Sequence, residues 1–246
     1  MQTRNVPSTG PRYWTAISIA SVFGANLGDF VSHDLHLGHM RGLPALALIF
    51  AAILLGERRS KSASEAYYWL AIVMVRTAAT NLADLATHDF KLAYGWVIAG
   101  LTVLLLAVLL FDRIAARDAM ASARDGQSRG VLATNGGYWT AMLIAGTLGT
   151  ALGDGLAGDM GLGVGPASVI LGLGLAAVFS LHAQPAFTTR AFYWVTIVAV
   201  RTTGTTSGDV LAHSLGLELS TACTGLLFAL TLSMWKTAPR AILDEA

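Results

Sequence analysis

Four aspartates recur at one fixed spacing within apolar stretches of the chain. Each lies fifteen residues after a tryptophan, and each of these tryptophans directly follows a tyrosine. The aspartates are Asp29, Asp84, Asp154 and Asp209. A carboxylate at bilayer depth is costly and usually faces protein or water, so four at one level predict a layer of groups that bind cations or protons. The competing interpretation is structural: each carboxylate bonds threonines or caps a backbone break, and so fixes helix registry.

Threonine, asparagine and histidine side chains accompany the aspartates. Counted from each tryptophan, positions 8, 11, 15 and 19 share an arc of about 80° on a helix. Positions 8 and 11 hold Thr77, Thr80, Thr147, Thr150, Thr202 and Thr205. The first repeat has Val22 and Ala25 there, with Asn26 beside them, and Gly158 occupies position 19 of the third. Position 19 is otherwise His33, His88 and His213. Together with the four aspartates, these histidines are candidate ligands for Mn²⁺ or another borderline divalent ion.

Arg76 and Arg201 are the remaining charges within the apolar stretches, each seven residues after its tryptophan. Three roles stay open for them. They snorkel toward the membrane surface, pair with another helix, or bind an anion at the mouth of a pathway. Four ionised carboxylates in a low-dielectric site repel one another, so we expect at least one to hold a proton near neutral pH.

Composition excludes a soluble globular protein. The chain has 246 residues, of which 54% are hydrophobic and 13% charged, about half the ~25% charged share of a soluble domain. A net charge of +1 without a dense basic run gives no footprint for nucleic acid. The lone Cys223 cannot form an intrachain disulfide. We expect a polytopic membrane protein whose partner is the lipid bilayer.

Apolar stretches predict eight transmembrane helices. A helix needs about 20 residues to cross the hydrocarbon core. The spans lie near residues 13–32, 43–56, 67–87, 93–111, 138–157, 164–183, 192–212 and 216–235. Residues 112–137 are polar and predict a cytoplasmic linker between a first half, 1–111, and a second half, 138–246.

Repeated Tyr-Trp pairs open every odd-numbered span. Within each half the tryptophans are 55 residues apart, and equivalent tryptophans of the two halves are 125 apart. The pairs are Tyr13-Trp14, Tyr68-Trp69, Tyr138-Trp139 and Tyr193-Trp194. The pattern predicts an all-α protein of four tandem helical hairpins, in two parallel halves related by an axis along the membrane normal. We interpret the aromatic pairs as anchors at headgroup level.

Loop charges and small residues predict orientation and packing. Loops and termini on the Trp-bearing side hold twelve Lys and Arg residues, against two on the other side. This asymmetry predicts that the Trp-bearing side and both termini are cytoplasmic. Positions 10 and 14 after each tryptophan are Gly or Ala, a ridge that lets a neighbouring helix approach closely.

The repeated Tyr-Trp and Gly-Asp motifs, with the clear form Arg201-Thr202-Thr203-Gly204-Thr205, carry a family resemblance. The sequence resembles a bacterial family of uncharacterised membrane-anchored proteins built from a repeat of unknown function. The resemblance runs from Tyr13 to Trp235. It implies a repeated two-helix unit in a bacterial inner membrane and brings no activity with it.

Transport is the function that these residues favour. The leading hypothesis is a proton-coupled transporter of cations, with export of a divalent metal such as Mn²⁺ as one form. One alternative is a proton-coupled transporter of a small organic anion bound by Arg76 and Arg201. Another is a redox protein whose three position-19 histidines ligate haem or approach a quinone. No motif of a hydrolase, metalloprotease or nucleotide-binding enzyme occurs, so we expect no enzyme and no cofactor. The sequence is also compatible with a homo-oligomer.

Overall fold

The computed structural model describes residues 7–60, 64–122, 134–181 and 189–235. This part of the chain is all-helical, with no strand, as the sequence predicts. Its elements are α1 (Pro11–Asp29), η1 (Phe30–Asp34), α2 (Gly38–Arg59), α3 (Glu65–Asp84), η2 (Leu85–Asp89), α4 (Tyr94–Ser122), α5 (Gly136–Asp154), η3 (Gly155–Asp159), α6 (Val164–Leu181), α7 (Arg190–Leu215) and α8 (Leu217–Met234). The three η elements are single π-helical turns.

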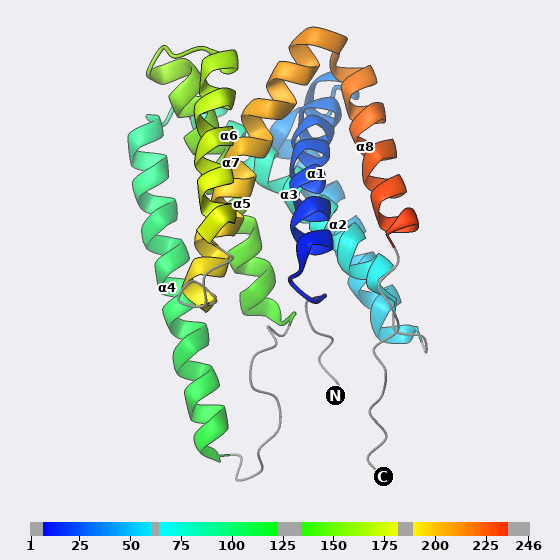
Figure 1. Ribbon diagram of the computed structural model, residues 1–246, viewed down its shortest axis with the longest axis vertical. Helices are drawn as coiled ribbons and strands as arrows, with labels where there is room; N and C mark the ends of the chain where they lie inside the picture. The colour runs from blue at the N-terminus through cyan, green and yellow to red at the C-terminus, as the bar shows by residue number, and fades with distance from the viewer. Residues whose placement is uncertain (1–6, 61–63, 123–133, 182–188, 236–246) are drawn as a thin grey trace.

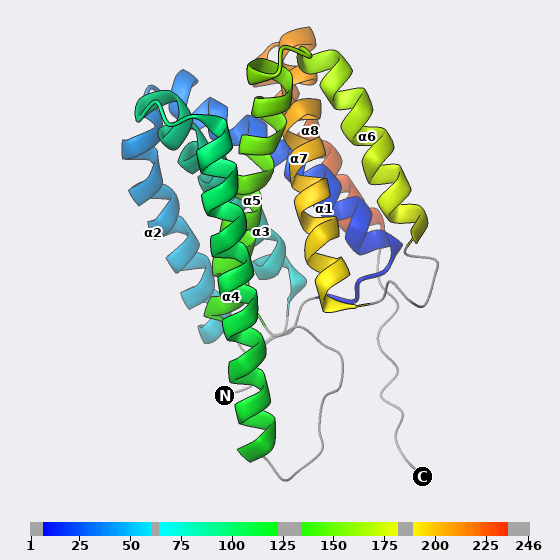
Figure 2. The same ribbon diagram turned by 90° about the vertical axis from the view of Figure 1, so that its left-hand side faces the viewer.

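The four odd-numbered helices form a closed inner ring. α1 contacts α3 and α7, and α5 contacts the same two helices from the opposite side. All four begin at the lower end of the molecule in Figures 1 and 2, so they run parallel to one another. The equivalent positions of the four repeats therefore lie at matching levels around one axis.

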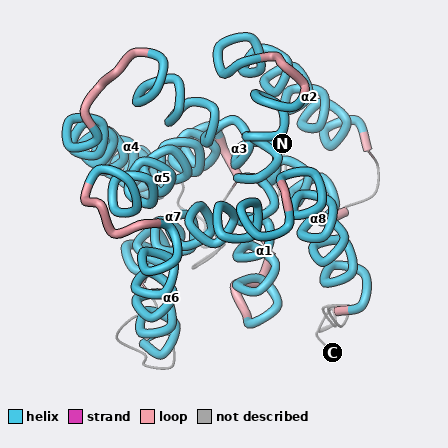
Figure 3. The backbone as a smooth tube through the Cα atoms, turned by 90° about the horizontal axis from the view of Figure 1, so that it is seen from above, coloured by secondary structure: helices cyan, strands magenta, loops and turns pink. Residues whose placement is uncertain are grey.

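The even-numbered helices surround this ring, but each packs mainly on the next repeat. α2 packs on α3, α4 on α5 and α6 on α7, while α8 returns to α1 and closes the circle. Figure 3, seen along the bundle, has these four helices on the outside. In all four repeats the two helices of a predicted hairpin therefore do not form the main packing pair, although α8 also contacts α7, and each repeat completes its core with its neighbour.

Among the described residues, six helical segments are long and apolar enough to cross a membrane. They are α2, α3 with η2, α4, α5 with η3, α6 and α8. The outer helices expose large apolar side chains on their outward sides, including Leu48, Val103, Leu173 and Leu226. Such surfaces indicate a multi-pass membrane protein. The inner helices α1 and α7 are not among these six segments.

Helix α4 is longer than the predicted apolar span near 93–111. α4 continues to Ser122, well into the predicted linker, because several alanines there favour helix even after the apolar stretch has ended. Asn135, at the other end of the same linker, donates a hydrogen bond to Asp112 over 3.1 Å. Residues 123–133 lie outside the described residues.

The predicted ridge of small residues is present, and it fits residues one turn lower on the next inner helix. Position 10 of each repeat meets position 7 of the following one. The pairs are Gly24 with Arg76, Ala79 with Gly146, Gly149 with Arg201, and Gly204 with Ser21. A Cβ added at Gly149 would lie 2.5 Å from the Cβ of Arg201. Glycine is required wherever its partner is larger, and in the one contact where position 10 is alanine the partner is glycine.

Candidate functional site

Three of the four aspartates stand where an α-helix changes into a π turn. Asp29, Asp84 and Asp154 end α1, α3 and α5, and the five residues after each form η1, η2 and η3. π turns inside helices widen the backbone locally and are frequent at functional sites. Asp209 instead lies within α7, which continues to Leu215 without a π turn. The equivalent aspartate therefore precedes a π turn in three repeats and lies within a continuous α-helix in the fourth.

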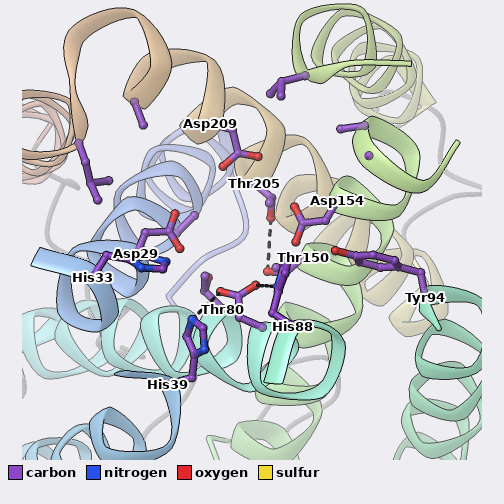
Figure 4. A pocket seen from close by; sticks show the side chains of 17 residues that line it. Asp29, His33, His39, Thr80, His88, Tyr94, Thr150, Asp154, Thr205 and Asp209 are labelled. Atoms are coloured by element: carbon purple, nitrogen blue, oxygen red, sulfur yellow. Dashed lines mark hydrogen bonds and ion pairs between the residues drawn. The ribbon is translucent and has the colours of Figure 1, made fainter. Parts of the chain in front are cut away.

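All four aspartates line one cavity of about 640 Å³ between the inner helices. Its rim includes residues of the turns that follow those helices, so it opens at that end of the bundle. Figure 4 shows carboxylates from α1, α5 and α7 directed into it, with Thr80, Thr150 and Thr205 below them. The aspartates also interact electrostatically with one another. The four aspartates that recur at one spacing in the sequence thus form one shared acidic layer in the structure.

Arg76 lies beneath Thr80, Thr150 and Thr205 of the cavity lining, as a floor to this layer of threonines, and joins all four inner helices. Its Nη1 donates to Thr80 Oγ1 at 2.9 Å and to Thr150 Oγ1 at 2.7 Å, while Nη2 donates to Thr205 Oγ1 at 2.6 Å. Its Nε donates to the backbone oxygen of Ser21 at 3.2 Å. The side chain is fully buried, so Arg76 does not snorkel. Its guanidinium is held by hydroxyls and one carbonyl, and in the described part of the chain no ion pair includes it.

Arg201 has the opposite environment, although it occupies the same position of its repeat. It is fully buried, and none of its three guanidinium nitrogens has a hydrogen-bond partner among the described residues. Arg76 and the tyrosines of the four Tyr-Trp pairs lie close enough to influence it electrostatically. The guanidinium of Arg76 is thus held at the threonines, whereas that of Arg201, at the same position of its repeat, lies within the influence of the tyrosines at the start of the inner helices.

A ring of four tyrosine hydroxyls closes the bundle at the end opposite the cavity. The hydroxyl of Tyr13 lies 3.0 Å from that of Tyr68 and 2.6 Å from that of Tyr193. Tyr138 completes the ring at 2.7 Å from Tyr68 and 3.2 Å from Tyr193. Because each hydroxyl has one proton and two lone pairs, four protons suffice for all four bonds.

The neighbouring tryptophans form a collar around this ring. Each packs edge-on against the tyrosine before it, at ring-centroid distances of 5.1–5.3 Å. All four tryptophans and all four tyrosines are buried, with at most 8% of any residue exposed. The interpretation of the Tyr-Trp pairs as headgroup anchors is therefore wrong. Their amphipathic character suits an interior position equally well, because the hydroxyls find partners in one another.

His39 is a cavity residue that the sequence did not single out from its loop. Its Nδ1 lies 3.1 Å from Asp89 Oδ2, and its Nε2 lies 3.9 Å from Asp84 Oδ2. His88 Nδ1 approaches the other oxygen of Asp84 at 3.5 Å. His39 thus links an exposed carboxylate to a buried one. His39 lies in the first turn of α2, after His33 and His36 in the sequence, and only the fold selects this ring among them.

Several predicted site residues lie elsewhere. Thr77, Thr147 and Thr202 each donate to the carbonyl four residues earlier in their own helix, and Asn26 donates to Ser220 Oγ on α8 over 3.1 Å. None of these four side chains lines the cavity. His33 and His88 do line it, whereas His213 does not. Within the ranges that the structure describes, no three His, Cys, Asp or Glu side chains are grouped closely enough to hold a metal ion.

The comparison with family models agrees with the repeat. A model described as Repeat of Unknown Function (DUF347) matches residues 12–62, 137–185 and 192–241. No curated protein and no solved structure matches the chain. The matched segments are the first, third and fourth repeats. The second repeat forms α3 and α4 in the equivalent places of the fold, and it has alanine instead of glycine at positions 10 and 14. The chain therefore belongs to the family built from this repeat of unknown function.

Proposed function

We propose that the protein is a proton-coupled membrane transporter of cations, in which all eight helices cross the bilayer. The observation that carries the proposal is the cavity lined by four aspartates, open at one end of the bundle and separated from the other end by Arg76 and the tyrosine ring. A transporter that alternates between two open states needs such a binding site with one end closed.

The acidic lining favours a cation as substrate. Four carboxylates face a space of about 640 Å³, within the range of about 300–1,000 Å³ that small-molecule sites occupy. This volume suits a small organic cation or a metal ion that keeps part of its water. Carboxylate, hydroxyl and imidazole groups at the rim suit Mn²⁺ among divalent metals, so Mn²⁺ is the first metal to test.

Proton coupling follows from crowding of the carboxylates. Four negative charges close together in a low-dielectric cavity repel, so binding a cation and releasing protons are linked. Asp84, His39 and Asp89 supply a chain of titratable groups from the cavity to the surface. By the distribution of Lys and Arg, we place the tyrosine ring and both termini on the cytoplasmic side of a bacterial inner membrane, with the cavity facing outward.

Reconstituted vesicles test this function directly. Purified protein in proteoliposomes is assayed for uptake of Mn²⁺ and of tetramethylammonium, with an internal pH dye reporting proton movement. Asp29→Asn, Asp84→Asn, Asp154→Asn and Asp209→Asn are each expected to abolish cation-driven proton flux while the protein still inserts. The matched control is Asp159→Asn, which removes an exposed carboxylate outside the cavity and is expected to keep full flux. Normal transport by all four cavity variants overturns the proposal.

A further inference from the structure

Two completely buried side chains beneath the acidic cavity, Arg201 and Ser21, have polar groups without hydrogen-bond partners among the described residues. The three nitrogens of the Arg201 guanidinium and the Oγ of Ser21 have no hydrogen-bond partner among the described residues, and both side chains are completely buried. A guanidinium keeps its charge at any physiological pH. A buried charge without a partner is strongly unfavourable, so this pair requires a compensating group.

The two residues belong to the same level of the inner ring. Both stand at position 7 of their repeats, on the neighbouring helices α7 and α1. Ser21 packs against Gly204, about one turn from Arg201 on the same helix. The equivalent position of α5 is Gly146, which has no side chain, and that of α3 is Arg76, whose guanidinium is engaged with the threonines.

Neighbouring layers offer Arg201 no anionic partner. On one side the guanidinium of Arg76 reaches up to the position-11 threonines. This Arg76 layer lies between the position-7 level and the aspartates, and no ion pair in the described ranges includes Arg201. On the other side the tyrosine hydroxyls are bonded to one another in their closed ring. Between these layers, Ile17, Ile72 and Ile197 are completely buried. The level is thus rich in donors, enclosed by apolar side chains and out of reach of the acidic groups.

We propose that Arg201 and Ser21 bind a small monovalent anion, of the size of chloride or formate, inside the bundle between the Arg76 layer and the tyrosine ring. A guanidinium and a hydroxyl are both donors to anions. The close contacts of Gly149 with Arg201 and of Gly204 with Ser21 restrict the ligand to a few atoms. If the proposed cation transport holds, the bound anion also lowers the positive barrier that two arginines place between the cavity and the opposite side.

Thermal unfolding of the purified full-length protein tests the site without any transport assay. Chloride or formate replaces gluconate at constant pH and ionic strength, and the melting temperature is followed against concentration. The wild type is expected to give a saturable rise. Arg201→Met is expected to lose it, and Ser21→Ala to raise the half-saturating concentration by about tenfold, the usual effect of removing one bond to a charged group. The control Arg41→Met removes an exposed arginine and is expected to respond like wild type.

Two further measurements keep the test decisive. In gluconate, Arg201→Met is expected to be at least as stable as wild type, because it removes an unpaired buried charge. If that variant does not fold, Ser21→Ala and Arg201→Lys, expected to bind more weakly than wild type, carry the test. The variant with all four cavity aspartates changed to asparagine is expected to keep the chloride response, which separates this site from the transport proposal. No saturable difference between chloride and gluconate, or an unchanged response in Arg201→Met, overturns the anion site.

Discussion

Arg76 and Arg201 occupy the same position of their repeats, yet their guanidinium groups have different partners. Arg76 meets three threonines because position 11 is threonine in the second, third and fourth repeats. Arg201 finds no hydrogen-bonding group in the described chain. Whether such an arginine bonds neighbouring helices or has no hydrogen-bond partner therefore depends on the residues around it more than on its place in the repeat.

Thr150 and Thr147 provide a matched pair that measures the Arg76 network. Both are buried on α5, but Thr150 accepts from Arg76 while Thr147 donates only to Leu143 O in its own helix. Thr150→Val is expected to lower the free energy of unfolding by about 1–3 kcal/mol, because it leaves a buried donor unsatisfied. Thr147→Val is expected to cost less than about 1 kcal/mol. Denaturant unfolding in mild detergent measures both losses. Equal losses contradict a stabilising hydrogen bond between Arg76 and Thr150.

A second residue-scale prediction concerns His39. If protons reach Asp84 through it, His39→Gln slows cation-driven proton flux by about a hundredfold or more, the order that a positioned acid–base group contributes, while thermal stability stays unchanged. His36→Gln is the control, since His36 is exposed and does not line the cavity. The readout is the pH profile of flux in proteoliposomes. Equal pH profiles for His39→Gln and wild type assign His39 no part in proton transfer.

The sequence predicted the cavity in part, and the reasons are physical. Helical periodicity correctly predicted that the position-11 threonines and the position-15 aspartates lie on one face of each inner helix, which the structure turns toward the cavity. The same periodicity also predicted Thr77 and Thr202 on that face. Their hydroxyls instead donate to the carbonyl four residues earlier in the same helix, and periodicity cannot predict which of these bonds a threonine makes. His39 arrives from a different helix, so its proximity to Asp84 depends on tertiary packing that spacing does not encode.

At the scale of elements, the contact between neighbouring inner helices depends on size complementarity. Gly24, Gly149 and Gly204 each face a larger residue, whereas Ala79 faces Gly146. The sequence showed the small-residue ridge but not its partner, because the partner depends on which helices are adjacent in the ring. The π turns were also not predicted, since their residues read as ordinary helix or loop in single-sequence patterns.

Gly149→Ala tests this complementarity. The added Cβ would lie 2.5 Å from the Cβ and 2.9 Å from the backbone carbon of Arg201, so α5 and α7 must separate. We expect a loss of about 1–3 kcal/mol in the free energy of unfolding, as for other overpacked cores. Gly172→Ala on α6 meets no atom within 4 Å and is expected to be neutral or stabilising by up to about 1 kcal/mol through helix propensity. Matching unfolding curves for the two variants contradict the proposed fit.

At the scale of the whole molecule, the helices form one continuous circle. α4 of the first half packs on α5 of the second, and α8 of the second half packs on α1 of the first. Each half therefore contributes outer helices that cover the inner helices of the other. Such an arrangement buries its apolar faces only when all four repeats are present, even though the sequence divides cleanly into two halves.

Cutting the chain between α4 and α5 tests this closure. Residues 1–122 and 134–246 expressed together are expected to copurify with a cooperative melting transition, because the contacts of α4 with α5 and of α8 with α1 hold the halves to each other. Either half expressed alone is expected to aggregate or be degraded, since its inner helices expose Arg76 or Arg201 with their polar neighbours to lipid. Size-exclusion chromatography and proteolysis of both preparations measure the outcome. A stable, monodisperse single half indicates that its two repeats form a self-sufficient core, and the circle is then assembled from two independent domains.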